Sequence, residues 1–228
     1  MVREYELSAY SIVLLGNFNP TIFTPSWFEK YDLLTEEEAA NADLTVVHPE
    51  ISRFVAAGLT IQVETNRFSA SGTASAIQLK DFVLKTFRDY LNHTPIRSLG
   101  INREVHYKLP SAEARMKLGR ALAPLDPWGE WGKEIDESKD SGGGLISLTM
   151  HLAKEPDTVK GHTRVTIQPS AQIPRNAGVF FQVNDHSEVI EDNINTTETV
   201  LDVLDQSFET SIAHSEWIID QVLTRAGA

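Results

Sequence analysis

The sequence predicts an α+β protein made of two similar units, each running strand, helix, antiparallel strands and helix, with its sheet packed on a long helix. Three observations favour this fold. The order of elements restarts near residues 93–95, "LLGNFN" is echoed by "SLGIN" in the first strands, and "IQVETN" is echoed by "FQVND" in the last. The predicted units are residues 1–94 and 95–228, with one continuous compact domain as the alternative. The two sheets would either pair into one saddle or pack back to back.

The elements of the first unit follow from apolar periodicity and from turn residues. Gly16 permits a turn after an apolar strand, and Thr35 with a glutamate three residues on makes a capping box. Pro49 should break a strand or place it at an edge, and Pro95 stops a helix. In order we expect a buried strand at 9–18, short helices at 24–34 and 35–42, strands at 45–58 and 59–72, and an amphipathic helix at 75–93.

The second unit repeats this order with a longer closing helix. Ser111 is the N-cap of its first helix, and Pro and Gly in "PLDPWGEWGKEIDESKDSGGG" predict a loop. We expect a strand at 95–109, a helix at 111–123, a loop at 124–144, strands at 145–154, 162–170 and 178–186, and a helix at 196–226. The apolar stripe of the last helix comprises Leu201, Leu204, Phe208, Ile212, Ile219, Val222 and Leu223.

Composition predicts a cytoplasmic protein that binds neither membranes nor nucleic acid. The 228 residues include no cysteine, and no run reaches the roughly 18 apolar residues of a membrane span. The start of the chain lacks the features of a signal peptide. A net charge of −12 opposes binding to a phosphate backbone. Six basic residues between Arg97 and Arg120, and eight acidic ones between Glu191 and Asp220, are either solvated faces or a head-to-tail contact with a partner.

Strand alternation gathers polar side chains on one face of the second sheet. Side chains at every second position of a strand share a face. By this rule the polar face carries the candidate ligand-binding residues Asn102, His106, His151, Arg164, Asn184 and His186, together with Glu104, Thr149 and Gln168. This face is either simply solvated, as in many antiparallel sheets, or concave and able to grip a ligand or peptide. In the second case His106, His151 and His186 should converge on one cavity.

The motifs of common catalytic and metal sites are missing from the sequence. There is no HExxH, no paired HxH, no G-x-S-x-G and no P-loop. We therefore predict no metal and no cofactor, and the sequence does not decide whether the protein is an enzyme.

Three tryptophans are candidate interface residues. Trp128 and Trp131 lie in the predicted loop, and Trp217 falls on the side of the last helix opposite its apolar stripe. Such large apolar side chains need a cover, which is either the rest of the chain or another protein. For Trp217 the two candidate covers are the Trp128–Trp131 segment and a second copy of the chain.

Three segments carry a resemblance to known proteins. "GNFNPTIFTPSWF" (16–28), "TPIRSLGIN" (94–102) and "LAPLDPW" (122–128) resemble sporadically distributed bacterial proteins with no assigned function, over most of the chain. The resemblance implies a bacterial cytoplasmic protein, encoded near defence or mobile-element genes, and transfers no catalytic residue.

These observations favour a binding or assembly module that acts on a protein partner or as a homo-oligomer. The alternative is a small-molecule-binding protein or enzyme that uses the polar sheet face. A third possibility is an acidic mimic of nucleic acid, against which the basic residues between Arg97 and Arg120 count.

Overall fold

The computed structural model describes residues 4–73, 75–137, 144–154, 159–190 and 196–225. In this part of the chain the strands form one nine-stranded antiparallel sheet in the order β2-β3-β4-β5-β1-β6-β9-β8-β7. The strands are β1 (Leu7–Gly16), β2 (Asp43–His48), β3 (Ile51–Ala56), β4 (Leu59–Glu64), β5 (Arg67–Gly72), β6 (Ile96–Lys108), β7 (Leu148–Ala153), β8 (Val159–Pro169) and β9 (Gly178–Val189).

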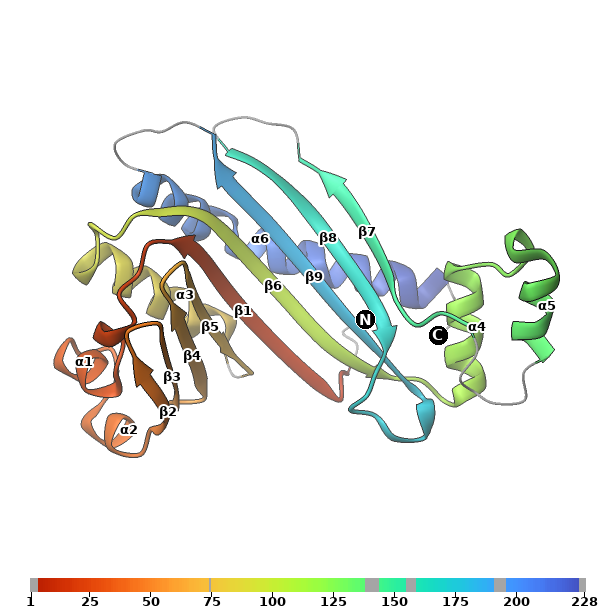
Figure 1. The fold of residues 1–228 in the computed structure, drawn as a ribbon, viewed down its shortest axis with the longest axis horizontal. Coiled ribbons are helices and arrows are strands. Elements are labelled where there is room, and N and C mark those ends of the chain that lie inside the picture. Colours follow the sequence, from red (N-terminus) through yellow and green to blue (C-terminus); the bar gives the residue numbers. More distant parts are fainter. Residues whose placement is uncertain (1–3, 74, 138–143, 155–158, 191–195, 226–228) are drawn as a thin grey trace.

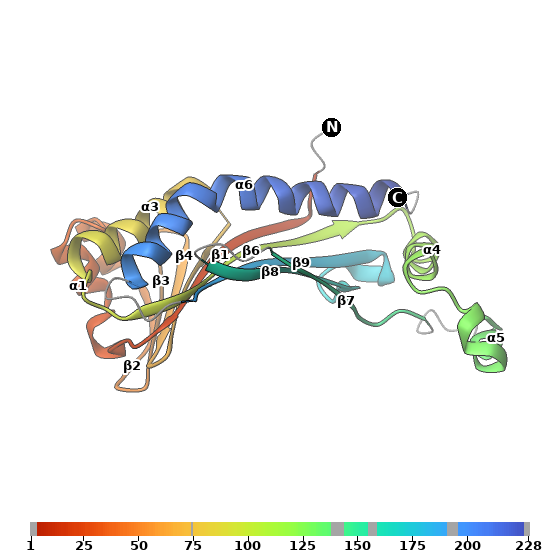
Figure 2. The ribbon, with the colours of Figure 1, turned by 90° about the horizontal axis from the view of Figure 1, so that it is seen from above.

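The helices lie on one face and at the two ends of this sheet (Figures 1 and 2). The helix α6 runs along the sheet, and α4 and α5 lie beyond its end. The α-helices are α1 (Pro25–Lys30), α2 (Glu36–Ala40), α3 (Ala76–Lys85), α4 (Ala112–Leu122), α5 (Gly129–Glu137) and α6 (Thr196–Arg225). A π-helical turn (Thr86–Tyr90) extends α3, and 3-10 turns occur at Pro20–Ile22, Asp126–Trp128 and Pro174–Asn176. None of the helices in the described ranges is long and apolar enough to cross a membrane.

The predicted division into two units, each with its own sheet on a long helix, is wrong. The strands β1 and β6, which were assigned to different units, are hydrogen-bonded neighbours from Leu7 opposite His106 to Gly16 opposite Ile96. This pairing makes one sheet of all the strands. In addition, α6 spans 30 residues whereas α3 spans 10, so the described chain has only one long helix.

Several local predictions are confirmed. Thr35 and Glu38 form the expected capping box at α2. Pro49 interrupts the run 45–58, which becomes the hairpin of β2 and β3, with β2 at the sheet edge. Ala57 and Gly58 both have positive φ in the next turn, where the absence of a Cβ makes glycine favourable.

The prediction of a loop at 124–144 is wrong over residues 126–137, where a 3-10 turn leads into α5. Residues 138–143 of the predicted loop lie outside the described ranges.

The buried side chains form two clusters between the sheet and its helices. The first cluster joins α1, α3 and the N-terminal half of α6 to β1, β3, β4, β5 and β6. The second joins the C-terminal half of α6 and α4 to β6, β8 and β9. The predicted stripe of α6 enters both: Leu204 and Phe208 belong to the first and Ile219 and Leu223 to the second. Thus α6 connects the two clusters.

A buried arginine ties α6 to the central strands. Arg103, on the covered face of β6, is 2% exposed. Its Nε lies 2.6 Å from Glu216 Oε1 on α6, and its Nη1 donates to the carbonyl oxygens of Ala9 and Glu104. The guanidinium lies over the rings of Tyr5 and Tyr10, at 5.2 and 4.4 Å from their centroids. The arginine is therefore paired, hydrogen-bonded and packed, as a buried charge requires.

Candidate functional site

One face of the sheet is not covered by α6. Figure 1 looks onto this open face, with α6 behind the strands. In Figure 2, β2 at one end and α4 with α5 at the other extend toward the open side, so the face of β6, β9 and β8 lies between two flanks. The open face is therefore the inner surface of a concave arrangement.

A row of polar residues crosses five neighbouring strands of the open face. Ser11 is paired with Asn102, Asn102 with Asn184, Asn184 with Arg164, and Arg164 with His151. The row thus contains four of the predicted ligand-binding residues, one from each of β6, β9, β8 and β7. Because adjacent strands are about 4.8 Å apart, the row extends for about 19 Å.

Side-chain amides connect β6 and β9 on the open face. Asn184 Nδ2 donates to Asn102 Oδ1 at 2.6 Å, and in the next row Gln182 Nε2 donates to Glu104 Oε1 at 2.7 Å. Asn102 is only 7% exposed, so water has little access to its side chain, and the hydrogen bond from Asn184 satisfies its Oδ1 instead. These contacts hold the side chains in fixed orientations.

A hollow of about 180 Å³ lies at the centre of this surface. Its lining includes Asn102, Asn184 and His186, which brings three of the predicted residues together. Gly100 forms part of it because glycine leaves the space of a side chain empty. A Cβ at position 100 would lie 3.0 Å from Asn184 Nδ2 and would reduce the hollow.

Three histidines lie side by side on β7, β8 and β9. The ring centroids of His151 and His162 are 4.8 Å apart, and those of His162 and His186 are 4.9 Å apart. His106 lies on the same face but away from this stack, where its Nδ1 is 2.7 Å from Ser170 Oγ and its ring packs on Phe180. The structure thus brings His151 and His186 near each other through His162, and leaves His106 apart.

Sequence reasoning missed His162 as a member of the site. The strand pattern assigned Arg164, Thr166 and Gln168 to the polar face, and extension of the same alternation by two residues includes His162. The pairing of His162 with His186 depends on the register of β8 and β9, which the pattern does not contain.

Burial lowers the pKa values of His106, His162 and His186 on this face. Desolvation is the main cause for His162, and the neighbouring charges of His186, Arg164, His151 and Lys154 lower its pKa further. Desolvation also lowers the pKa of His186, and that of His106. These rings are therefore more often neutral at pH 7 than a free histidine.

The contact between Ser170 and His106 is structural in character. Ser170 is 7% exposed, and its Oγ accepts hydrogen bonds from the backbone N–H groups of Gln172 and Ile173. An oxygen that accepts two N–H donors is a poor nucleophile, so this pair does not resemble the serine and histidine of a hydrolase. Within the described ranges, no group of three or more His, Asp or Glu side chains is placed to hold a metal ion.

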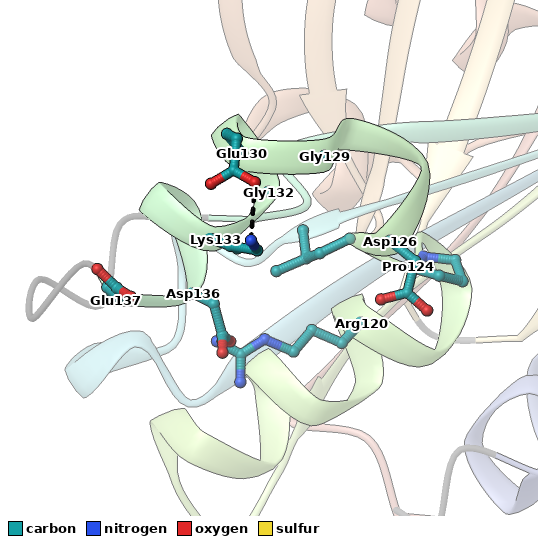
Figure 3. A pocket seen from close by; sticks show the side chains of 10 residues that line it. Arg120, Pro124, Asp126, Gly129, Glu130, Gly132, Lys133, Asp136 and Glu137 are labelled. Carbon is teal, nitrogen blue, oxygen red and sulfur yellow. Dashed lines mark hydrogen bonds and ion pairs between the residues drawn. The ribbon is translucent and has the colours of Figure 1, made fainter.

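A second cavity, of about 680 Å³, lies between α4 and α5 (Figure 3). Four of the charged side chains that line it form ion pairs. Arg120 Nη2 lies 2.5 Å from Asp136 Oδ1, and Lys133 Nζ lies 2.7 Å from Glu130 Oε1. Two of the predicted interface residues, Trp128 and Trp131, lie on the same segment, each 55% exposed, with centroids 5.2 Å apart. Their role as an interface stays a prediction.

Trp217 is 57% exposed on the outer side of α6 and stacks on His214, with centroids 5.6 Å apart. We expect Trp217→Ala to change the free energy of unfolding by less than about 0.5 kcal/mol, because exposed side chains contribute little. Denaturant unfolding measures this change, and light scattering measures the mass. A second copy covering Trp217 would show as a lower mass of the variant. A loss above about 2 kcal/mol at unchanged mass would contradict the exposed position.

No protein-family model matches the chain, and no curated protein is significantly similar to it in sequence.

Proposed function

We propose that this protein is a binding module that holds a partner protein chain on the open, concave face of its sheet. The observation that carries this proposal is the polar row of Ser11, Asn102, Asn184, Arg164 and His151, presented by adjacent strands. Most of these side chains are uncharged hydrogen-bonding groups. Such groups form direct contacts with a protein surface without the desolvation cost of a charge.

The size of the surface favours a macromolecular partner over a small molecule. Pockets for small ligands measure about 300–1,000 Å³, whereas the hollow on this face measures about 180 Å³. The row of about 19 Å is longer than such a hollow and suits a segment of polypeptide. In this view the hollow receives one side chain of the partner.

The chemistry of the face also favours binding over catalysis. The rings of His162 and His186 pack on each other with centroids 4.9 Å apart, and the hydroxyl of Ser170 is occupied by backbone donors. By resemblance alone, we place the protein in the bacterial cytoplasm, with a link to a defence or mobile-element locus. The partner is another protein or a second copy of this chain.

The proposal predicts that a probe on the open face contacts the partner. Thr149, on β7, is exposed and points to the open face, and it is replaced by a photo-crosslinking phenylalanine derivative in cells that make the protein. We expect one partner to be cross-linked from position 149 in stoichiometric amount. The same derivative at Asn41, an exposed residue at the end of α2, is the control and should give no such product.

A second variant connects this product to the polar row. Asn184→Leu removes the amide from the centre of the row, and we expect the partner's affinity to fall at least about tenfold, which is about 1.4 kcal/mol. Asn41→Leu is the matched control. Thermal unfolding checks that both variants fold. Equal cross-linking from positions 149 and 41, or unchanged affinity in a folded Asn184→Leu variant, would contradict the proposal.

A further inference from the structure

Arg164 is an exposed cation beside His162, the middle one of the three neighbouring histidines, and no carboxylate lies within ion-pair distance of it in the described chain. Its described side-chain contact is with His162, at 3.4 Å from Nη2 to Nε2. The acidic side chains that flank His186 on the adjoining strand β9 already have partners: Lys154 pairs with Asp185, and Lys160 pairs with Glu188 at 3.3 Å. The guanidinium thus retains donors for a ligand.

The three histidines place further donors around Arg164. His151 is its cross-strand partner on β7, His162 is two residues away on β8, and His186 is paired with His162 on β9. In the observed geometry His162 Nε2 accepts from the arginine, which requires a neutral ring at this nitrogen. Protonation would turn each ring into a donor of two N–H groups, directed at the same part of the open face.

We propose that Arg164, with His151, His162 and His186, forms a receptor for aspartate or glutamate side chains of the partner, and that this binding strengthens as the pH falls. This inference rests on the proposed function, because it names the chemistry that the open face recognises. A carboxylate ligand would accept hydrogen bonds from the guanidinium and from a protonated imidazole. Hydrogen bonds between charged groups of this kind are about twice as strong as neutral ones.

The charges of the protein favour a carboxylate over a phosphate. Among the described cations on β8 and next to β7, Arg164 is the one without an ion pair at neutral pH, since Lys154 and Lys160 are engaged, and one charge matches a monoanion. The planar guanidinium fits the two oxygens of a carboxylate as well as those of a phosphate, so the preference for a carboxylate comes from its single charge. Because the chain as a whole has a net charge of −12, an acidic segment would be repelled elsewhere and attracted to this cluster.

The direction of the pH dependence follows from the histidines. Burial, with the neighbouring positive charges, holds the pKa of His162 below its ordinary value of 6.5, and burial does the same for His186. A bound carboxylate favours the protonated ring and raises these pKa values. The complex then holds more protons than the free protein, so affinity rises as the pH falls through the pKa values of the complex. The other charged groups that act on these two rings are Lys154, Asp185 and Glu188.

Fluorescence anisotropy with a labelled ten-residue glutamate peptide, at pH 6.0 and pH 8.0, tests this inference. We expect tighter binding at pH 6.0, a loss of at least about tenfold in Arg164→Gln, and a weaker pH dependence in His162→Gln. Arg225→Gln is the matched control. Arg225 is also an exposed arginine, at the end of α6 and so away from the open face, with a described contact of 3.4 Å to Gln221, and its replacement should leave the affinity unchanged.

Two further measurements separate the possible outcomes. NMR titration of the histidine Cε1–H signals should show a higher pKa for His162 with the peptide than without it. Inorganic phosphate should compete only weakly, and displacement of the peptide by phosphate at lower concentration would overturn the assignment to carboxylates. Equal peptide binding by wild type and Arg164→Gln would overturn the inference itself. The cross-linking experiment at position 149 does not depend on this result. It therefore tests the proposed function separately from the inference about carboxylates.

Discussion

Replacing Glu216 by alanine should lower the free energy of unfolding by about 3 kcal/mol, because it leaves the charge of Arg103 buried without its carboxylate. Arg103 is 2% exposed, so water cannot replace the lost partner. The variant also removes the acceptor of Tyr5, whose hydroxyl donates to Glu216 Oε2 at 2.5 Å. Chemical denaturation monitored by circular dichroism measures the effect.

Replacing Arg103, the other partner of this ion pair, should lower the free energy of unfolding by a smaller amount. Arg103→Met removes the buried charge and retains most of the side-chain volume, and Glu216, at 35% exposure, can be hydrated when the arginine is gone. We expect a loss of about 1 kcal/mol, in line with the replacement of buried ion pairs by apolar residues. Glu209→Ala is the control on the same helix, since its ion pair with Lys80 is on the surface, and it should cost less than about 0.5 kcal/mol. Equal losses for Glu216→Ala and Glu209→Ala would refute the role of Arg103.

Arg103 also shows which features the sequence does not predict. In a strand with period two, Arg103 falls among the apolar residues Ile101 and Val105, where a charge has no obvious place. Its partner Glu216 is 113 residues away on α6. Local pattern identifies the face of a residue, and only the packing of α6 across β6 supplies the partner that makes a buried arginine stable.

The same limit applies to the sheet and to the open face. Alternation correctly assigned Asn102, Arg164 and Asn184 to one face, because the direction of a side chain depends only on its position in its own strand. It did not reveal that β1 pairs with β6, since strand pairing is a contact between distant segments. The prediction of two similar units, each with its sheet packed on a long helix, failed at this step.

Glycine misled the prediction at α5. Gly129 and Gly132 favour a loop in the sequence, yet α5 begins at Gly129 and continues through Gly132. At Gly132 a Cβ would lie 2.4 Å from the carbonyl oxygen of Leu125, so glycine permits the close approach of α5 to the preceding turn. A glycine required by a tertiary contact has the same appearance in a sequence as one required by a turn.

Phe208→Ala should lower the free energy of unfolding by about 3–5 kcal/mol, and Leu223→Ala by about 2–5 kcal/mol. Both side chains are at most 1% exposed, and they belong to different clusters under α6. Because α6 and the single sheet connect these clusters, we expect each substitution to destabilise the whole sheet in one cooperative transition. Hydrogen exchange of the amides in β3 and β4, compared with those in β8 and β9, measures this directly.

The comparison between the two ends of the sheet decides the outcome. If the chain is one cooperative unit, Phe208→Ala accelerates exchange in β8 and β9 as much as in β3 and β4, although Phe208 lies in the first cluster. If residues 1–94 and 95–228 were independently stable, Leu223→Ala would open β8 and β9 and leave β3 and β4 protected. Thr210→Ala, at an exposed position of the same helix, is the control and should leave exchange at both ends unchanged. We expect the first result, because β1 and β6 are hydrogen-bonded from Leu7 to Gly16 and opening either half would expose the edge of the other.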